Sequence, residues 1–261
     1  GETRPRFIAL SNAYHGETLG ALAVGDVGLY RETFAPLLMQ PRVVPGPDNY
    51  LRGPGESPEQ MASRAAAQME AVLAEHAHDT CAVIVEPLVQ CAGGMRMYHA
   101  SYLRQLRALC DRYGVLLIVD EIATGFGRTG TLFACEQAGI APDCLLLGKG
   151  LTGGFLPLSV CLTTEKIYSA FYGDYTSGKA FLHSHSYSGN PLACAAANAT
   201  LDLFAETDVL AANRALSQHM MKSAAALADH PHVADVRQTG MILAVECVKD
   251  KATREPWPWQ E

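Results

Sequence analysis

Short apolar runs recur along the chain, and each is bounded by polar or turn-forming residues. Five runs show little alternation between apolar and polar positions, which is typical of strands in a sheet that is covered on both faces. The predicted strands are residues 6–10, 81–87, 115–121, 144–149 and 158–164.

Segments with a helical period separate these strands. Ser57-Pro58 followed by Gln60 has the pattern of a capping box, which predicts a helix over residues 58–76. A second predicted helix begins at Ser101. Its apolar face carries Leu103, Leu106, Leu109 and Cys110.

Two more helices are expected in the last third of the chain. Residues 191–205 are rich in alanine, a strong helix former, and residues 208–229 continue the helical pattern. From about residue 230 the pattern changes to "VADVRQTGMILAVECV", which predicts strands of a smaller unit. The segment "VVPGPDNYLRGPGESP", residues 43–58, is expected to be a long loop.

The order of these elements predicts an α/β fold. Strands that alternate with helices form a mostly parallel sheet with right-handed crossovers and helices on both faces. We assign residues 1–205 to this large domain. Residues 206–261 are assigned to a connecting helix and part of a smaller C-terminal α/β domain.

Composition narrows the classes of function. Of 261 residues, 49% are hydrophobic and 18% charged, with a net charge of −7, so nucleic acid is an unexpected partner. No apolar run approaches a membrane span, and the start "GETRPRFIAL" has no signal-peptide core. Eight cysteines form no C-x-x-C pair and sit mostly in apolar surroundings, which favours buried reduced thiols and a cytoplasmic protein.

Charged residues end several of the predicted strands. "VIVEP" carries Glu86, "LLIVDE" carries Asp120 and Glu121, and "LLLGK" carries Lys149. In open α/β sheets, ligands bind at the carboxyl ends of the strands. Lysine is seldom buried, and a neutral amine at a strand end is a nucleophile.

An aspartate that ends one apolar strand and a lone lysine that ends a later one suit pyridoxal phosphate. The amine forms a Schiff base with the aldehyde, and the aspartate keeps the pyridine nitrogen protonated. Ile122 and Tyr14 could pack on the two faces of the ring. The simpler alternatives are a helix cap or salt bridge for Asp120 and an exposed lysine in a glycine turn for Lys149.

Other motifs around the lysine are weaker. A P-loop is excluded by spacing, and "GKGLTGG" fits the letters of the dinucleotide-binding motif G-x-G-x-x-G, but a loop rather than the required helix is expected after it. His183 and His185 could bind zinc, but no further ligand supports a metal site. Ser186 and Ser188, ahead of a predicted helix at Pro191, suit either an anion or an ordinary serine cap.

The block "VDEIATGFGRTGTLFACEQAGIAPDCLLLGKGLTGGFLPLS" resembles class III aminotransferases of pyridoxal-phosphate fold type I. "EPLVQCAGGMRMYH", "NAYHGETLGALAVG" and "GNPLACAAANATL" extend the resemblance over essentially the whole chain. Within the class, these segments are most similar to the enzymes of biotin synthesis. The resemblance therefore implies transfer of an amino group from S-adenosylmethionine to 8-amino-7-oxononanoate.

The resemblance also implies roles for single residues. Lys149 and Asp120 are the catalytic pair, and Ser186 reaches the cofactor phosphate of the neighbouring subunit, so a homodimer with shared sites is expected. The implied cofactor contacts are Tyr14, His15, Asp120, Ile122, Lys149 and Ser186. The implied substrate contacts are Tyr14, Glu17, Glu86, Arg128 and Gly150.

Three positions depart from the pattern of the class. Glu17 stands where many relatives have aspartate, and Cys91 replaces a common glycine. Ala123 stands where ornithine and 4-aminobutyrate aminotransferases have glutamine, which argues against those substrates. Arg128 suits a substrate carboxylate, although a surface arginine in a glycine-rich loop is the plain alternative.

Members of this class begin before Gly1 and continue past Glu261, so the chain is expected to be the central part of a longer enzyme. The turn that holds the cofactor phosphate and another carboxylate-binding arginine would lie outside it. Two alternatives stay open, a different class III ω-aminotransferase and an inactive fragment that only binds partners.

Overall fold

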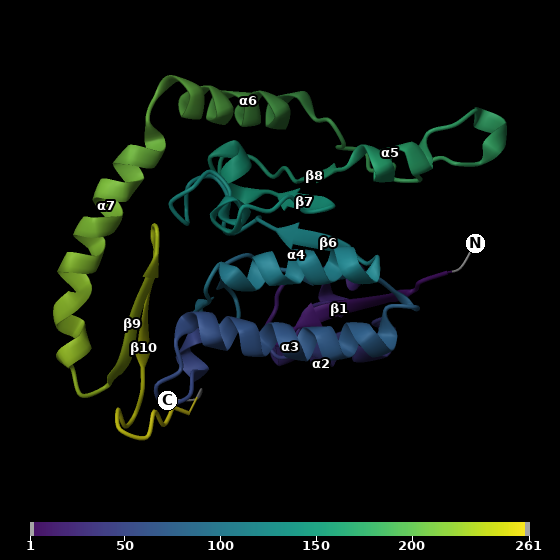
Figure 1. Ribbon diagram of the computed structural model, residues 1–261. Helices are drawn as coiled ribbons and strands as arrows, with labels where there is room; N and C mark the ends of the chain where they lie inside the picture. The colour runs from purple at the N-terminus through teal and green to yellow at the C-terminus, as the bar shows by residue number, and fades with distance from the viewer. Residues whose placement is uncertain (1–2, 259–261) are drawn as a thin grey trace.

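A central sheet organises the protein in the computed structural model, which describes residues 3–258 (Figure 1). The strand order is β2-β1-β3-β6-β7-β8, and β8 alone is antiparallel to its neighbour, β7. The strands are β1 (Arg6–Leu10), β2 (Arg42–Val44), β3 (Thr80–Val85), β6 (Leu116–Asp120), β7 (Cys144–Leu147) and β8 (Val160–Thr163). The predicted α/β class with a mostly parallel sheet is confirmed.

β2 overlaps the first two residues of the segment that we expected to be a loop. It pairs in parallel with β1 at the sheet edge, and a short 3₁₀ turn, η2 (Asn49–Leu51), follows it. Prolines at positions 41 and 45 flank β2. Three residues are too few to show a strand period in the sequence. This segment is a strand because it pairs with β1.

Two long helices cover one face of the sheet, α3 (Pro58–His76) and α4 (Ser101–Tyr113) (Figure 1). The capping box of α3 is confirmed, since Ser57 Oγ accepts the Gln60 N–H at 3.2 Å and Gln60 Oε1 accepts the Ser57 N–H at 2.8 Å. The predicted apolar face of α4 is buried against the sheet. The largest core cluster includes Ile8, Leu10, Met69, Leu73, Val83, Val85, Leu103, Leu106, Leu117 and Val119.

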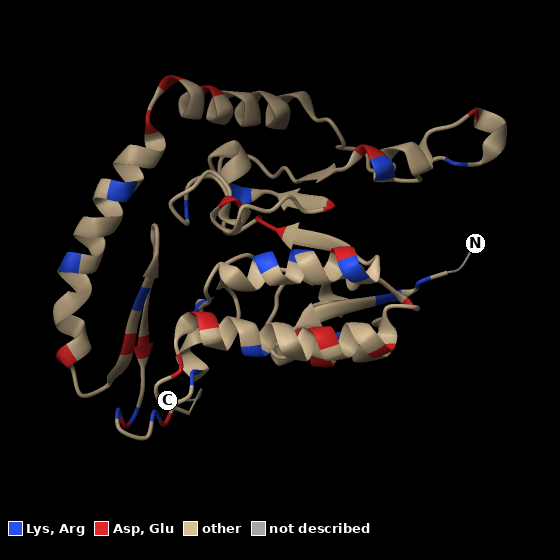
Figure 2. Ribbon diagram, viewed as in Figure 1, with Lys and Arg blue, Asp and Glu red and all other residues tan. Residues whose placement is uncertain are grey.

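Acidic and basic residues are interspersed along the outer surfaces of these helices (Figure 2). An ion pair between Glu70 and Arg112 links α3 to α4. Exposed pairs of this kind contribute about 0–1 kcal/mol, so the apolar contacts beneath them determine the packing.

Several short elements were not predicted. Between β1 and β2 lie α1 (Leu19–Ala23), α2 (Gly28–Phe34) and the 3₁₀ turn η1 (Ala35–Leu37), and a small hairpin joins β4 (Val89–Gln90) to β5 (Arg96–Met97). Helix α5 (Glu165–Phe171) projects from the body of the molecule, followed by η5 (Tyr175–Ser177) (Figure 1). These elements are too short for their periodicity to be recognised in the sequence.

The C-terminal part begins with α6 (Pro191–Glu206) and α7 (Val209–Ala224), which a 3₁₀ turn, η6 (Ala225–Asp229), extends. A hairpin of β9 (Val233–Thr239) and β10 (Ile242–Cys247) follows and lies beside α7 (Figure 1). The predicted strands after residue 230 are confirmed. The domain boundary at residues 205/206 stays a prediction, and residues 1–2 and 259–261 of the two predicted units lie outside the described residues.

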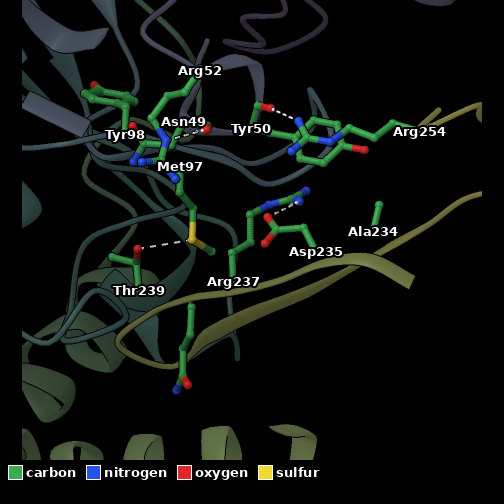
Figure 3. A pocket seen from close by; sticks show the side chains of 11 residues that line it. Asn49, Tyr50, Arg52, Met97, Tyr98, Ala234, Asp235, Arg237, Thr239 and Arg254 are labelled. Atoms are coloured by element: carbon green, nitrogen blue, oxygen red, sulfur yellow. Dashed lines mark hydrogen bonds and ion pairs between the residues drawn. The ribbon is translucent and has the colours of Figure 1, made fainter. Parts of the chain in front are cut away.

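The hairpin is joined to the large domain through a cluster of arginines around Tyr50 (Figure 3). The guanidinium carbons of Arg96 and Arg254 lie 4.8 Å from the Tyr50 ring centroid, and that of Arg237 lies 5.7 Å away. Glu246 of β10 accepts a hydrogen bond from Arg96 and forms an ion pair with Arg237. A cavity of about 260 Å³ remains beside this cluster.

All eight cysteines are free thiols. Cys110 and Cys135 are buried, as expected, but Cys161 and Cys247 are exposed, so the expectation of burial is wrong for these two. Both lie on strands at the edges of their sheets, where one strand neighbour is absent.

Of the helices described between residues 3 and 258, none has the length and apolar character needed to cross a membrane.

Candidate active site

Parallel pairing of β6 with β7 brings Asp120 and Lys149 to the same edge of the sheet. The register pairs Asp120 with Leu146, and the Glu121 N–H donates to the Leu146 carbonyl at 2.9 Å. Lys149 follows three residues later. A cavity of about 270 Å³ opens there, lined by Tyr14, His15, Gly16, Glu86, Cys91, Ala92, Asp120, Ile122, Ala123 and Lys149.

Asp120 is buried and held from two sides. Its Oδ2 lies 2.8 Å from Nδ1 of His15, and its Oδ1 accepts the Ile122 N–H at 3.0 Å. His15 comes from the loop after β1 and is itself buried, with an Nε2 that has no hydrogen-bond partner among the described residues. A carboxylate can accept about four hydrogen bonds, so Asp120 retains acceptor capacity toward the cavity.

Glu86 is a second buried carboxylate beside this cavity. It follows β3, and its two oxygens accept the backbone N–H groups of Tyr14 and Cys91, each at 3.0 Å. Burial raises the pKa of Glu86 to about 6, although these N–H groups and nearby His15 favour the charged form. The carboxyl group can therefore change its charge close to neutral pH.

Lys149 lies at the mouth of the site, where the small cavity meets a larger one. The residue is exposed in the described chain, as the simpler alternative of a lysine in a glycine turn has it. Its φ of 44° falls in the left-handed region, which is uncommon for lysine. The turn is closed by the 3₁₀ helix η4 (Lys149–Thr152), in which the Leu151 N–H donates to the Gly148 carbonyl at 3.0 Å.

Helix α6 packs behind the turn of Lys149. Leu147 and Leu151 form a small apolar cluster with Ala197 of α6 and with Phe126. A Cβ atom on Gly150 would lie 3.0 Å from Cβ of Phe126, so a side chain at this position would push against the ring. Gly150 therefore permits the close approach of the 126 loop to the turn of Lys149.

The larger cavity has a volume of about 950 Å³, and Arg128 is the expected substrate contact that lines it. Arg128 is exposed at its border, with Nη1 donating to the Ala123 carbonyl at 3.2 Å. Glu17 lies on the exposed side of Tyr14 and accepts the tyrosine O–H at 2.9 Å. The remaining lining residues are Ile122, Gly148, Lys149, Gly154, Phe155, Leu156, Pro157, Leu158, Ser159, His183, His185, Tyr187, Ser188 and Gly189.

Three predicted site residues, Glu17, Gly150 and Ser186, line neither cavity, and Ser186 is exposed. It does not cap α6, because Asn190 Oδ1 accepts the N–H groups of Leu192 and Ala193 at 3.0 and 3.1 Å. The alternative of an ordinary serine cap is therefore wrong.

Among residues 3–258, no group of three or more His, Cys, Asp or Glu side chains is arranged to hold a metal.

Sequence reasoning missed the supporting role of Glu121. Its carboxylate is buried, accepting the Thr124 O–H at 2.6 Å and the Cys135 N–H at 2.8 Å, and thereby holds the loop that follows Asp120. Its position after an apolar strand was the available signal. The neutral thiol of Cys91 was also not assigned a place in the cavity, and burial raises its pKa to about 11.

The comparisons with known proteins agree with this geometry. The sequence profile described as "Aminotransferase class-III" matches residues 1–258. The adenosylmethionine-8-amino-7-oxononanoate aminotransferase of Nitratidesulfovibrio vulgaris is 45% identical over 99% of this chain and 48% of its own length. The chain spans about half the length of the curated relatives it matches.

Two solved structures have the same fold. The adenosylmethionine-8-amino-7-oxononanoate aminotransferase of Methanocaldococcus jannaschii is 37% identical, with a TM-score of 0.89 over 98% of this chain and 57% of its own. An ω-transaminase of Pseudomonas jessenii in complex with PMP is 30% identical, with a TM-score of 0.90 over 97% and 56%. A strand-end lysine and aspartate line one cavity in a chain with this fold. The chain belongs to the class III aminotransferase family.

The raised pKa of Glu86 predicts a pH-dependent stability. The folded state binds a proton more tightly than the unfolded state, so stability falls as pH rises from about 4.5 to about 6, by about 2 kcal/mol in total. Glu86→Gln removes this contribution. In urea unfolding, the difference in unfolding free energy between variant and wild type should shift by about 1.5 kcal/mol of this total between pH 4.5 and 7. An exposed control, Glu206→Gln, should show no shift, and a pH-independent difference for Glu86→Gln would contradict the assignment.

Proposed function

We propose that the protein is a pyridoxal-phosphate-dependent aminotransferase that transfers an amino group from S-adenosylmethionine to 8-amino-7-oxononanoate. The observation that carries the proposal is the meeting of Lys149 and Asp120 in one cavity, in a chain 45% identical to a relative named for this reaction. Because the chain spans about half of that relative, the activity is proposed for the full-length protein.

The residues of the small cavity fit the cofactor. Asp120 has free acceptor capacity, buried beside a histidine that holds it in place. Ile122 and Tyr14 line the same space and would contact the ring. When bound, pyridoxal phosphate supplies an electron sink for the substrate carbon that loses its proton. Asp120 would hold the proton on the ring nitrogen, because its buried negative charge favours the protonated form.

Lys149 would hold the aldehyde end of the cofactor. Its side chain is exposed at the boundary of the two cavities, so it can reach a group in the small cavity and a substrate in the large one. The free amine is also the base that can accept a proton and return it. The left-handed backbone at Lys149 sets the direction of the side chain, and the packing of η4 against α6 maintains it.

Arg128 and Glu86 are the proposed substrate contacts with opposite charges. A guanidinium at the border of the large cavity suits the carboxylate of either substrate. Glu86 presents a carboxyl group to the small cavity, together with Tyr14, whose hydroxyl is oriented by Glu17. The favoured alternative keeps the same residues and the same cofactor but uses another ω-amine as donor.

A second copy of the chain would complete the site. Residues 155–187, here called the apolar arm, comprise the edge strand β8 and its flanking residues together with the segment of α5 and η5, which projects from the body of the protein (Figure 1). Large exposed apolar surfaces mark interaction sites. Phe155, Tyr172, Tyr175, Leu182 and Tyr187 on this arm are between 72% and 101% exposed. We infer that a symmetry-related arm covers this surface and that Ser186, free of any capping role, reaches the partner's cofactor phosphate.

Lys149→Ala should abolish transamination by the full-length protein while leaving its stability nearly unchanged. The variant loses the attachment point and the base together, so the rate should fall on the order of 10³-fold or more. Since the side chain is exposed, the unfolding free energy should change by less than about 0.5 kcal/mol. Lys166→Ala, on the exposed surface of α5, is the matched control. Wild-type turnover in the Lys149 variant would exclude this lysine from the chemistry.

The amino donor can be identified by half-reactions without the ketone substrate. The protein loaded with pyridoxal phosphate is mixed separately with S-adenosylmethionine, lysine and a simple amine, and the oxidised product of each is quantified. We expect S-adenosylmethionine to react at least about tenfold faster than the others. Faster reaction with lysine or the simple amine would favour the alternative ω-aminotransferase, and reaction with none would favour an inactive protein.

Mixing two inactive variants tests the shared site. Lys149→Ala chains are mixed with Ser186→Glu chains, whose carboxylate should repel the phosphate. In a mixed dimer one site carries both changes and the other carries neither, so random exchange should restore about a quarter of wild-type activity. Ser184→Glu, two residues away, is the control and should be active by itself. If mass spectrometry verifies exchange and no activity returns, Ser186 does not act across the subunits.

A further inference from the structure

The loop that carries Arg128 is contacted by the turn of the C-terminal hairpin, more than a hundred residues later in the chain. The Met241 N–H donates to the Arg128 carbonyl at 2.7 Å. This bond joins the backbone next to the proposed carboxylate-binding side chain directly to the β9–β10 turn. The position of Arg128 therefore depends on an element outside the sheet that forms the cavity.

Gly240 makes this contact possible. Its φ is +58°, a conformation that favours glycine. A Cβ atom built on Gly240 would lie 2.4 Å from the Thr129 carbonyl carbon, 2.5 Å from the Arg128 oxygen and 2.6 Å from the Gly130 nitrogen. All three are backbone atoms, so no side chain could move aside. Any larger residue must displace the turn or the loop.

Helix α7 contacts the same loop one residue earlier. Asn213 Nδ2 donates to the Gly127 carbonyl at 3.4 Å. A Cβ atom on Gly127 would lie 2.9 Å from Asn213 Nδ2 and 3.1 Å from Leu210 Cδ2. Helix α7 and the β9–β10 turn therefore both contact residues 127–130. The contacts are close because glycines and backbone atoms, rather than larger side chains, lie between the elements.

The turn is itself held in place. Ser217 Oγ of α7 donates to the Gly240 carbonyl at 2.6 Å, and Gln238 Nε2 donates to the same oxygen at 2.7 Å. Farther along β9, Arg237 donates to the carbonyls of Gly94 and Met95 at 2.7 and 2.8 Å and lies beside Tyr50 (Figure 3). Because the hairpin is anchored along β9 as well as at its turn, it can act as a fixed support.

We propose that the β9–β10 turn is a support that positions Arg128 over the large cavity, and that Gly240 is a positioning residue for substrate binding. This inference rests on the proposed role of Arg128 in binding a substrate carboxylate. The loop also carries Phe126, which touches Gly150 beside Lys149. A shift at Gly240 therefore reaches the substrate side of the site without altering any group that contacts the substrate.

The structural half of the proposal is tested by hydrogen exchange in the full-length protein. Gly240→Ala should increase amide exchange in residues 123–132. Gly114→Ala is the matched control, because Gly114 has a similar φ of +63° but nothing within 4 Å of its Cβ position. Both variants carry the same backbone strain, and only one displaces the loop. Equal exchange in residues 123–132 of the two variants would overturn the supporting role of the turn.

The functional half is tested by a double-mutant cycle. Gly240→Ala should raise the KM for 8-amino-7-oxononanoate by about tenfold or more, with a smaller change in kcat, because misplacement weakens substrate binding. In an Arg128→Ala background, Gly240→Ala should add little, since the group that it positions is gone. The link to Arg128 would be overturned if Gly240→Ala left KM unchanged. It would also be overturned if the double variant raised KM by the product of the two single effects.

A milder variant covers the case in which Gly240→Ala does not fold. Ser217→Ala removes one hydrogen bond to the turn and should raise exchange in residues 123–132 and KM in the same direction, by smaller factors. No change in either quantity would count against the proposal. If wild-type protein shows no transamination at all, the proposed function fails, and the exchange experiment still decides whether the turn supports the loop.

Discussion

Parallel pairing of β6 with β7 is the constraint on which the site depends. Parallel strands place their carboxyl ends at one edge, so Asp120 and Lys149 meet although they are separated by a loop of more than twenty residues. The pairing is stable because β6 lies in the middle of the sheet, between β3 and β7. Its apolar side chains, such as Leu117 and Val119, pack into the core beneath α3 and α4.

Burial of acidic groups at this edge is balanced by local donors. Asp120 has His15 and a backbone N–H, Glu86 has two backbone N–H groups, and Glu121 has a hydroxyl and an N–H. A buried carboxylate without partners would lose its charge. Most of these donors come from the segments after β1, β4 and β6, so segments that form the cavity also set its electrostatics.

The two ends of the site differ in how completely this chain encloses them. The side of Asp120 is buried, whereas the side of Lys149 opens onto the large cavity and the apolar arm. A cofactor ring held at Asp120 and a substrate entering past Lys149 would suit this difference. The C-terminal hairpin adds a third constraint, because it contacts the loop of Arg128 through backbone atoms rather than through side chains.

Local signals in the sequence determined much of the fold and pointed to the strand-end residues of the candidate site. The capping box at Ser57 predicted α3 with its observed bounds, the apolar run at residues 6–10 predicted β1, and charged residues after such runs identified Asp120 and Lys149. Each signal lies within one element, where spacing along the chain equals position in space. The family resemblance added His15 and Arg128 without showing what they contact.

Tertiary structure decided the rest. β2 forms because residues 42–44 pair with β1 at the edge of the sheet. Lys149 is exposed because the elements beside it leave the mouth of the site open. The hydrogen bond from His15 to Asp120 and the contact of Gly240 with the Arg128 loop join residues about a hundred positions apart. Such contacts follow from the path of the whole chain through space, and no period or motif within a segment can encode them.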